Sequence, residues 1–311
     1  MSLASREGSM LAPLAPAAPR EHRTQASAGV GLFIALVGVS LSAIFIKLAA
    51  SPPLTIATNR MLAALLLLLV PILGGGWHGL ARIQARDMGG LAVSGISLGV
   101  HFGLWTLSLA YTSVASSVVF VSTYPVCVAV VEWLWLGQRL PRAGWLGVAL
   151  TLVGGVLIGW NDLITGAGDT QRLLGDGLAL AGGAALVGYL IIGRQLRQHL
   201  DIWTYSVPVY GVAWLVLLGW TSATGGDVRA FPPTDLVWFV ALAVCSTLAG
   251  HTVLNWALRH VSASLVAVTM VGEPIGAALL AWLILGQPVG PLTALGGAVI
   301  LGGIWLTARA V

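Results

Sequence analysis

One acidic side chain lies in the interior of a long apolar segment. Glu273 directly precedes Pro274 within the apolar run that covers residues 262–285. A carboxylate at such a depth costs about 2.5 to 3.5 kcal/mol on membrane-insertion scales, so it must face a cavity, form a pair or bind a proton. We expect Glu273 to exchange protons or to bind an amine group. The alternative is a structural ion pair with Lys47 or Arg60.

Two histidines lie in other apolar segments, each with a polar or aromatic residue one helical turn later. His101 is followed by Trp105, and His251 is followed by Asn255. Residues four apart share a helical face, and imidazole can bind ligands or relay protons near neutral pH. We expect the two faces to form opposing walls of one cavity. The alternative is that both histidines are neutral packing residues.

Three further side chains complete the candidate set. Tyr189 is an additional aromatic candidate for the cavity. Lys47 lies near the end of its apolar segment, where its ammonium group can reach the membrane interface. Arg60 lies about two turns inside its segment, too deep to be unpaired, and we expect a structural ion pair.

No other pattern in the chain predicts catalysis, a metal or a cofactor. The sequence has no HExxH motif and no phosphate-binding loop. Cys127 and Cys245 are isolated from each other and from histidine clusters, so they predict neither a redox pair nor a metal site. The acids near predicted outer helix ends are expected to be solvated; they are Asp162, Asp169, Asp176, Asp227 and Asp235.

These residues must be positioned by membrane-spanning helices. Hydrophobic residues make up 57% of the 311-residue chain and charged residues only 8%, against roughly 25% charged residues in soluble domains. The composition is typical of an all-α polytopic membrane protein whose partner is the lipid bilayer. The 15 Lys and Arg residues are scattered between apolar segments, which does not favour binding to nucleic acid.

A helix needs about 20 apolar residues to cross a bilayer, and the sequence contains ten such segments. Their approximate bounds are 29–49, 53–73, 89–110, 113–136, 143–160, 175–195, 203–222, 234–257, 262–285 and 289–308. With a cytoplasmic N-terminus, eleven Lys and Arg residues fall on the cytoplasmic side and only Arg172 and Arg229 on the outer side. Cytoplasmic connections hold such an excess. We therefore predict a cell (inner) membrane protein with both termini cytoplasmic.

The chain contains an internal repeat. Residues 113–157 align without a gap on residues 262–306, with 15 identities in 45 positions. The matches include Pro125 with Pro274 and the Leu-Gly-Gln triplet after each segment, and Tyr124 aligns with Glu273. This makes Tyr124 a candidate for the wall opposite the acid.

Five spans in each copy invert the second copy relative to the first. In the inverted copy, Arg139 and Arg142 are replaced by Pro288 and Pro291, in agreement with the charge rule. We predict four parts of the chain: a flexible cytoplasmic tail (1–27), a first five-helix repeat (28–160), an external linker (161–174) and a second five-helix repeat (175–308).

The ten segments, the two prolines and the W-L-x-L-G-x endings resemble those of the EamA-type permeases of the drug/metabolite transporter superfamily. The resemblance covers roughly residues 30–308. One departure is that the family often has Glu where this chain has Gln138 and Gln287. The family's ion pairing at those two positions is therefore not expected here.

The resemblance implies a secondary transporter that works by alternating access. The resemblance implies amino acids or related metabolites as substrates, moved outward. The mostly apolar and aromatic midplane favours a small amphiphilic substrate. Glu273 is compatible with protons as a coupling ion and with transport without them, and we expect a monomer. The alternatives are efflux of hydrophobic cations or drugs and, less favoured, an intramembrane enzyme.

Overall fold

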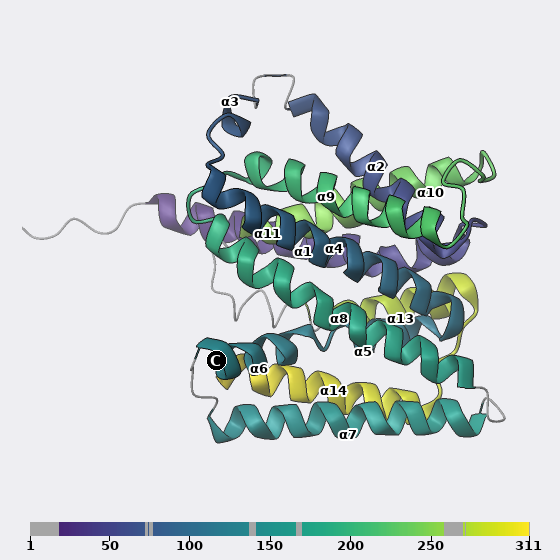
Figure 1. Cartoon of the computed structure of the whole chain (residues 1–311). Helices are drawn as coiled ribbons and strands as arrows, with labels where there is room; N and C mark the ends of the chain where they lie inside the picture. Colours follow the sequence, from purple (N-terminus) through teal and green to yellow (C-terminus); the bar gives the residue numbers. More distant parts are fainter. Residues whose placement is uncertain are drawn as a thin grey trace, which may run out of the picture.

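A computed structural model describes residues 19–71, 74, 77–136, 141–165, 170–257, 270 and 272–310 of the chain, and this part contains helices but no strands. In chain order the helices are α1 (Pro19–Leu48), α2 (Pro53–Pro71), α3 (Trp77–Leu80), α4 (Ala85–Tyr111), α5 (Val114–Val121), α6 (Tyr124–Leu136), α7 (Arg142–Thr165), α8 (Thr170–Leu196), α9 (Ile202–Ala223), α10 (Asp235–Ala241), η2 (Leu242–Thr252), α11 (Val253–Ala257), α13 (Gly272–Leu285) and α14 (Pro291–Ala310). The start of α1 and the end of α14 lie at the same end of the bundle (Figure 1).

The helices have the length and composition of a polytopic membrane protein. Within the described residues, seven helical segments are long and apolar enough to cross a membrane. They are Gly29–Leu48, Pro53–Val70, Ala85–Tyr111, Val114–Val131, Thr170–Leu196, Ile202–Ala223 and Asp235–Ala257. Three shorter apolar helices cover Arg142–Ile158, Gly272–Leu285 and Pro291–Thr307. The predicted membrane class is therefore confirmed.

Two expected irregular regions are partly helical. Helix α1 already begins at Pro19, inside the segment expected to be a flexible tail, and residues 1–18 lie outside the described part. Helices α7 and α8 extend to Thr165 and from Thr170, so only residues 166–169 of the expected linker lie outside the described helices.

The two aligned prolines stand near helix starts. Helix α5 ends at Val121, a turn covers residues 122–123, and α6 starts one residue before Pro125. Helix α13 starts at Gly272, two residues before Pro274. Proline lacks the N–H that would continue the backbone ladder of a preceding helix, but it fits the first turn of a new one. Each proline therefore places a helix N-terminus within its apolar segment.

An eleven-residue π-helix, η2, interrupts the segment that carries His251. Its side chains follow the wider winding, because Thr247 Oγ1 donates to the carbonyl of Leu242 at 3.2 Å and Thr252 Oγ1 donates to that of Thr247 at 3.1 Å. Hydrogen bonds between residues five apart place such residues on one face. Ser246 and His251 therefore share a face of η2.

Glycines allow close helix packing. Gly95, Gly99 and Gly103 recur every four residues on α4, and a side chain at any of them would collide with α9. This spacing of small residues lets α4 and α9 approach closely. At the edge of the bundle α7 and α14 lie side by side (Figure 1).

The α7–α14 contact is reciprocal. A Cβ atom on Gly147 would lie 2.5 Å from the carbonyl oxygen of Gly303, and one on Gly154 would lie 2.6 Å from that of Gly296. In the sequence repeat, Gly147 aligns with Gly296 and Gly154 with Gly303. Each glycine thus packs against the counterpart of the other one, so the two helices run antiparallel.

The repeated Leu-Gly-Gln triplet ends a helix and caps another. Gly286 follows the last residue of α13 with a φ of 63°, a conformation that glycine adopts without strain. The side-chain oxygen of Gln287 then accepts a hydrogen bond of 3.3 Å from the backbone N–H of Val114, the first residue of α5. The first triplet, including Gln138, lies outside the described residues.

Two acids that we expected to be solvated are buried. Asp176 is 5% exposed and accepts a hydrogen bond of 2.8 Å from the hydroxyl of Thr112. Asp235 is 1% exposed and binds the α1–α2 connection through Ala50 and Ser51. The prediction that these two carboxylates are solvated is wrong, because residues in distant connections donate hydrogen bonds to them. Asp227 is exposed as expected, whereas the positions of Asp162 and Asp169 lie outside the residues whose side chains are described.

Candidate functional site

The two histidine faces meet in the core of the bundle. The rings of His101 on α4 and His251 on η2 are 6.2 Å apart between centroids. Phe102 packs edge-on against His251 at 5.2 Å, and Trp105 stacks on His101 at 6.2 Å. His101 Nδ1 lies 2.9 Å from the carbonyl oxygen of Gly182, which favours the tautomer that donates from Nδ1. Nε2 of His101 is then left as an acceptor.

Tyrosines from α8 and α9 close this cluster. The amide of Asn255 donates to the hydroxyl of Tyr189, whose ring packs edge-on against that of His251 at 6.5 Å. The Tyr210 hydroxyl pairs with Thr252 at 2.9 Å. Tyr189 and Asn255, both predicted from the sequence, thus lie together beside His251.

Arg60 is fully buried against the same cluster. Its guanidinium carbon lies 4.0 Å from the centroid of the Phe102 ring. Its terminal nitrogens donate to the hydroxyls of Ser42, Ser246 and Thr247 at 3.4, 3.1 and 3.0 Å. Among the described side chains no carboxylate lies within 4.0 Å of Arg60, so the expected ion pair is not formed there. Neutral hydroxyls and an aromatic face take its place.

Glu273 lies in the first turn of α13 and is half-buried. The hydroxyl of Ser40 on α1 donates to its backbone carbonyl at 3.5 Å. Tyr124, at the start of α6, is close enough for its hydroxyl to feel the charge of the carboxylate. No Lys or Arg among the described side chains comes within 4.0 Å of it. The N-terminal end of a helix favours a nearby negative charge, so the start of α13 supports the carboxylate in place of a cation.

The remaining predicted candidate, Lys47, stands apart from the histidine cluster. It lies in the last turn of α1 and is half-buried. Its position at the helix end fits a side chain that extends toward the membrane interface.

Several buried donors near the site have no hydrogen-bond partner among the described residues. They include Nε1 of Trp105, Nε of Arg60 and the hydroxyl of Ser122, which follows α5. Buried polar atoms are nearly always paired in folded proteins. These groups are donors in the described core whose partners are not described side chains.

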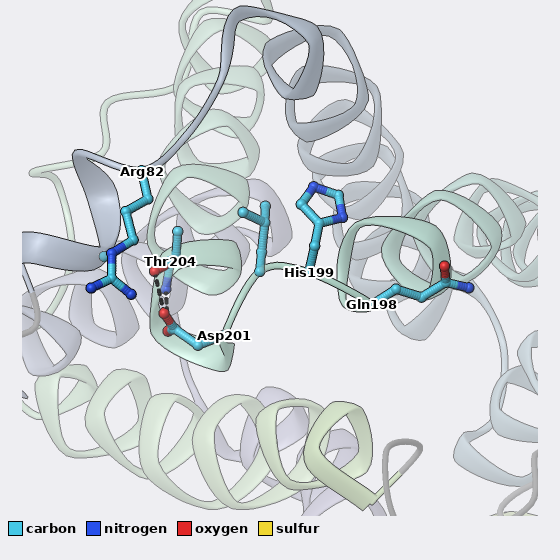
Figure 2. Close-up of a pocket in the computed structure, with 7 residues that line it drawn as sticks. Arg82, Gln198, His199, Asp201 and Thr204 are labelled. Atoms are coloured by element: carbon cyan, nitrogen blue, oxygen red, sulfur yellow. Dashed lines mark hydrogen bonds between the residues drawn. The ribbon is translucent and has the colours of Figure 1, made fainter.

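A surface pocket of about 200 Å³ lies away from the cluster, at the connection from α8 to α9. Figure 2 shows Arg82 near Thr204 and Asp201. His199 and Gln198 lie just before Asp201 in the same connection. Sequence reasoning singled out none of these as site residues.

Asp201 caps α9 in this pocket. It accepts from the backbone N–H groups of Trp203 and Thr204 at 2.9 Å and from the Thr204 hydroxyl at 2.6 Å. Burial raises the pKa of Asp201, whereas the hydrogen bonds from these donors lower it. The lowering effect is the larger one, so the pKa lies below its usual range. The carboxylate serves the helix N-terminus, so the pocket is less suited to a substrate than the core cluster.

Both halves of the chain match one family. Residues 27–160 and residues 173–309 each match the EamA-like transporter family. The chain belongs to the EamA-like transporter family. The resemblance found in the sequence is therefore confirmed, and general transport across a membrane follows from the family.

Relatives of this EamA-like chain are also transporters by description. An uncharacterized transporter of Synechocystis sp., sll1319, is 24% identical over 58% of this chain, and the match spans only about half (54%) of that relative. An uncharacterized transporter of Bacillus subtilis, YwfM, is 21% identical over 70% of this chain and 72% of its own. A solved crystal structure matches with a TM-score of 0.63 at 17% identity, covering 91% of this chain and 97% of that one. It supports the fold of the EamA-like chain.

Proposed function

We propose that this EamA-like chain is a secondary transporter of the cell (inner) membrane that moves a small amphiphilic metabolite, such as an amino acid, outward by alternating access. The observation that carries the proposal is the environment of Glu273. This half-buried carboxyl group stands at a helix start within the bundle and has no cation within 4.0 Å of it among the described side chains. Ionisable groups in such places mark substrate or ion pathways.

The inverted-repeat architecture is part of this proposal. The two separate family matches and the reciprocal Gly147–Gly303 and Gly154–Gly296 contacts support two copies of opposite orientation. If α5 with α6, and α10 with η2 and α11, each form one span, and the segment that ends in α13 forms another, the chain has ten spans. The two half-helix starts, at Tyr124 and Glu273, then lie in equivalent places in the two copies, as in other transporters built this way.

The aromatic and imidazole groups of the core favour a substrate with an apolar body and a small polar head. Trp105, Tyr189 and Phe102 offer ring surfaces. Glu273 would bind a substrate amine when ionised or carry a proton in exchange. Both roles fit a transporter driven by a proton gradient. Efflux of hydrophobic cations is the second candidate, because an unpaired acid also suits a cation without a carboxylate.

The test is counterflow in proteoliposomes that contain the purified full chain. Vesicles loaded with a panel of the twenty protein amino acids are diluted into labelled amino acids, and the label inside is measured over time. A carrier shows transient accumulation that depends on the internal substrate. A flux without such dependence would indicate a channel, and chemical change of the label would indicate an enzyme. Labelled hydrophobic cations, run in parallel, test the second candidate.

A further inference from the structure

Arg60 is a positive charge in the bundle core with only neutral partners in the described part of the chain. Its side chain is 0% exposed. Three hydroxyls hold the terminal nitrogens, Phe102 covers the guanidinium, and Nε–H has no acceptor. No described carboxylate, whether the half-buried Glu273 or the buried Asp87, Asp176 and Asp235, lies within ion-pair distance of it.

Structural support alone does not account for this arrangement. Hydroxyls orient a guanidinium and satisfy its N–H groups, but they leave its charge uncompensated in a medium of low dielectric constant. A buried cation in a membrane segment normally faces a counter-ion, a cavity or a pathway. No described side chain supplies a counter-ion, and a mobile anion would compensate the charge.

The surroundings of Arg60 fit a bound organic anion. Ser246 and Thr247 belong to η2, the π-helix that also presents His251, and such interruptions are frequent at functional sites. Phe102 lies between the guanidinium and the His251 ring, and next to His101. The unpaired Nε1 of Trp105 belongs to the same cluster. Hydrogen-bond donors and aromatic rings thus gather around the guanidinium of Arg60.

We infer that Arg60 is the receptor for a carboxylate on the transported molecule. A guanidinium matches the two oxygens of a carboxylate. One positive charge compensates a monoanion, whereas a phosphate dianion would need a second cation that the described core does not supply. The inference rests on the proposed transport function and sharpens it, because it adds a carboxylate to the features that the substrate must carry. Hydrophobic cations without a carboxylate are then excluded as main substrates.

The first experiment removes only the carboxylate from the probe. Counterflow is measured with the twenty amino acids and with the same amino acids as their amides, which keep the amine and side chain. The transported acids should exchange at least about 30-fold faster than their amides, because truncating one partner of a buried charge pair costs that much or more. Arg60→Lys should retain part of the exchange and Arg60→Met should abolish it. Amides that exchange as fast as the acids would overturn the assignment.

The second experiment needs no substrate. Thermal unfolding of the ligand-free Arg60→Met variant is compared with that of the parent chain and of Arg229→Met, a matched loss of charge at a side chain that is 90% exposed. If Arg60 is a receptor, its uncompensated charge destabilises the ligand-free protein. The hydroxyl of Thr247 also keeps its hydrogen bond to the Leu242 carbonyl when the guanidinium is removed. The Tm of Arg60→Met should therefore stay within about 2 °C of the parent or rise.

The two experiments separate the possible failures. If neither panel exchanges, the amino-acid form of the proposed function fails, and the thermal comparison alone decides the role of Arg60. A large fall in Tm for Arg60→Met, with Arg229→Met unchanged, shows that Arg60 is needed for the stability of the fold and overturns the inference. A stable Arg60→Met variant that has lost exchange of acids supports it.

Discussion

Asp235 accepts hydrogen bonds from both the backbone N–H and the hydroxyl of Ser51, which lies 184 residues earlier in the chain. A similar joint recurs at the start of α4, where Asp87 binds His199 of the α8–α9 connection at 3.0 Å. Asp87 stands in the first turn of α4 and binds the α8–α9 connection, while Asp235 starts α10 and binds the α1–α2 connection. The two halves are therefore tied together by exchanged contacts.

We predict that Asp235→Ala destabilises the chain far more than Asp227→Ala. The first change leaves the buried backbone N–H and hydroxyl of Ser51 without an acceptor, at about 1 to 3 kcal/mol for each unsatisfied group. Asp227 is exposed and pairs with an exposed Arg229, so its loss should leave Tm unchanged. Thermal unfolding in detergent measures both. Equal shifts for the two variants would contradict the role of the joint.

The second prediction concerns coupling. Glu273→Gln keeps the shape of the side chain but cannot bind and release a proton. We expect this variant to fold and exchange substrate, but to lose accumulation driven by a pH gradient in proteoliposomes. Glu273→Asp, which keeps the acid, is the control. Accumulation by Glu273→Gln at the parent level would show that the acid is not the coupling group.

If Glu273 instead belongs to a buried structural pair with a residue outside the described part, the same variant gives a different result. Breaking one partner of a buried pair costs about 3 to 5 kcal/mol. Yield and Tm would then fall together, before transport is considered. The stability measurement therefore precedes the flux measurement.

A third prediction tests the contact between Asn255 and Tyr189. Tyr189→Phe leaves the buried amide without its acceptor, and we expect a loss of about 1 to 3 kcal/mol. Because the two residues interact directly, the double variant with Asn255→Leu should be less destabilised than the sum, by about 0.5 to 3 kcal/mol. Tyr111→Phe, at an exposed position, is the control. Additive losses would mean that the two side chains act independently.

A fourth prediction uses two glycines with opposite surroundings. A Cβ atom on Gly38 of α1 would lie 2.2 Å from the backbone oxygen of Cys245, whereas one on Gly211 of α9 meets no atom within 4 Å. Gly38→Ala should cost about 1 to 3 kcal/mol through overpacking. Gly211→Ala should stabilise the helix by up to about 1 kcal/mol. The signs of the two Tm shifts check the packing of α1 against η2.

The sequence predicted those features that depend on local chemistry. Apolar length located the membrane helices, and the four-residue spacing of His101 and Trp105 located a face that points into the core. Asn255 was found because it follows His251 by one helical turn, and Tyr189 because it is an aromatic residue within an apolar segment.

Features that depend on distant partners were missed. The burial of Asp235 requires donors 184 residues away, and no local pattern shows them. Arg60 was expected to need an acid, but hydroxyls on η2 and the Phe102 ring surround it. The π winding of η2 has no signature in residue spacing, so Ser246 and His251 were not expected to share a face.

The reciprocal glycine contact means that α7 is synthesised long before α14, the helix on which it packs. The face of α7 that carries Gly147 and Gly154 packs on a helix that the ribosome completes about 149 residues later, or roughly 7 to 30 s at rates of about 5 to 20 residues per second. Until then this glycine face meets lipid or an insertion factor. The pairing of α7 with α14 is thus the last large helix contact to form. In a chain truncated before α14, the glycine face of α7 has no packing partner.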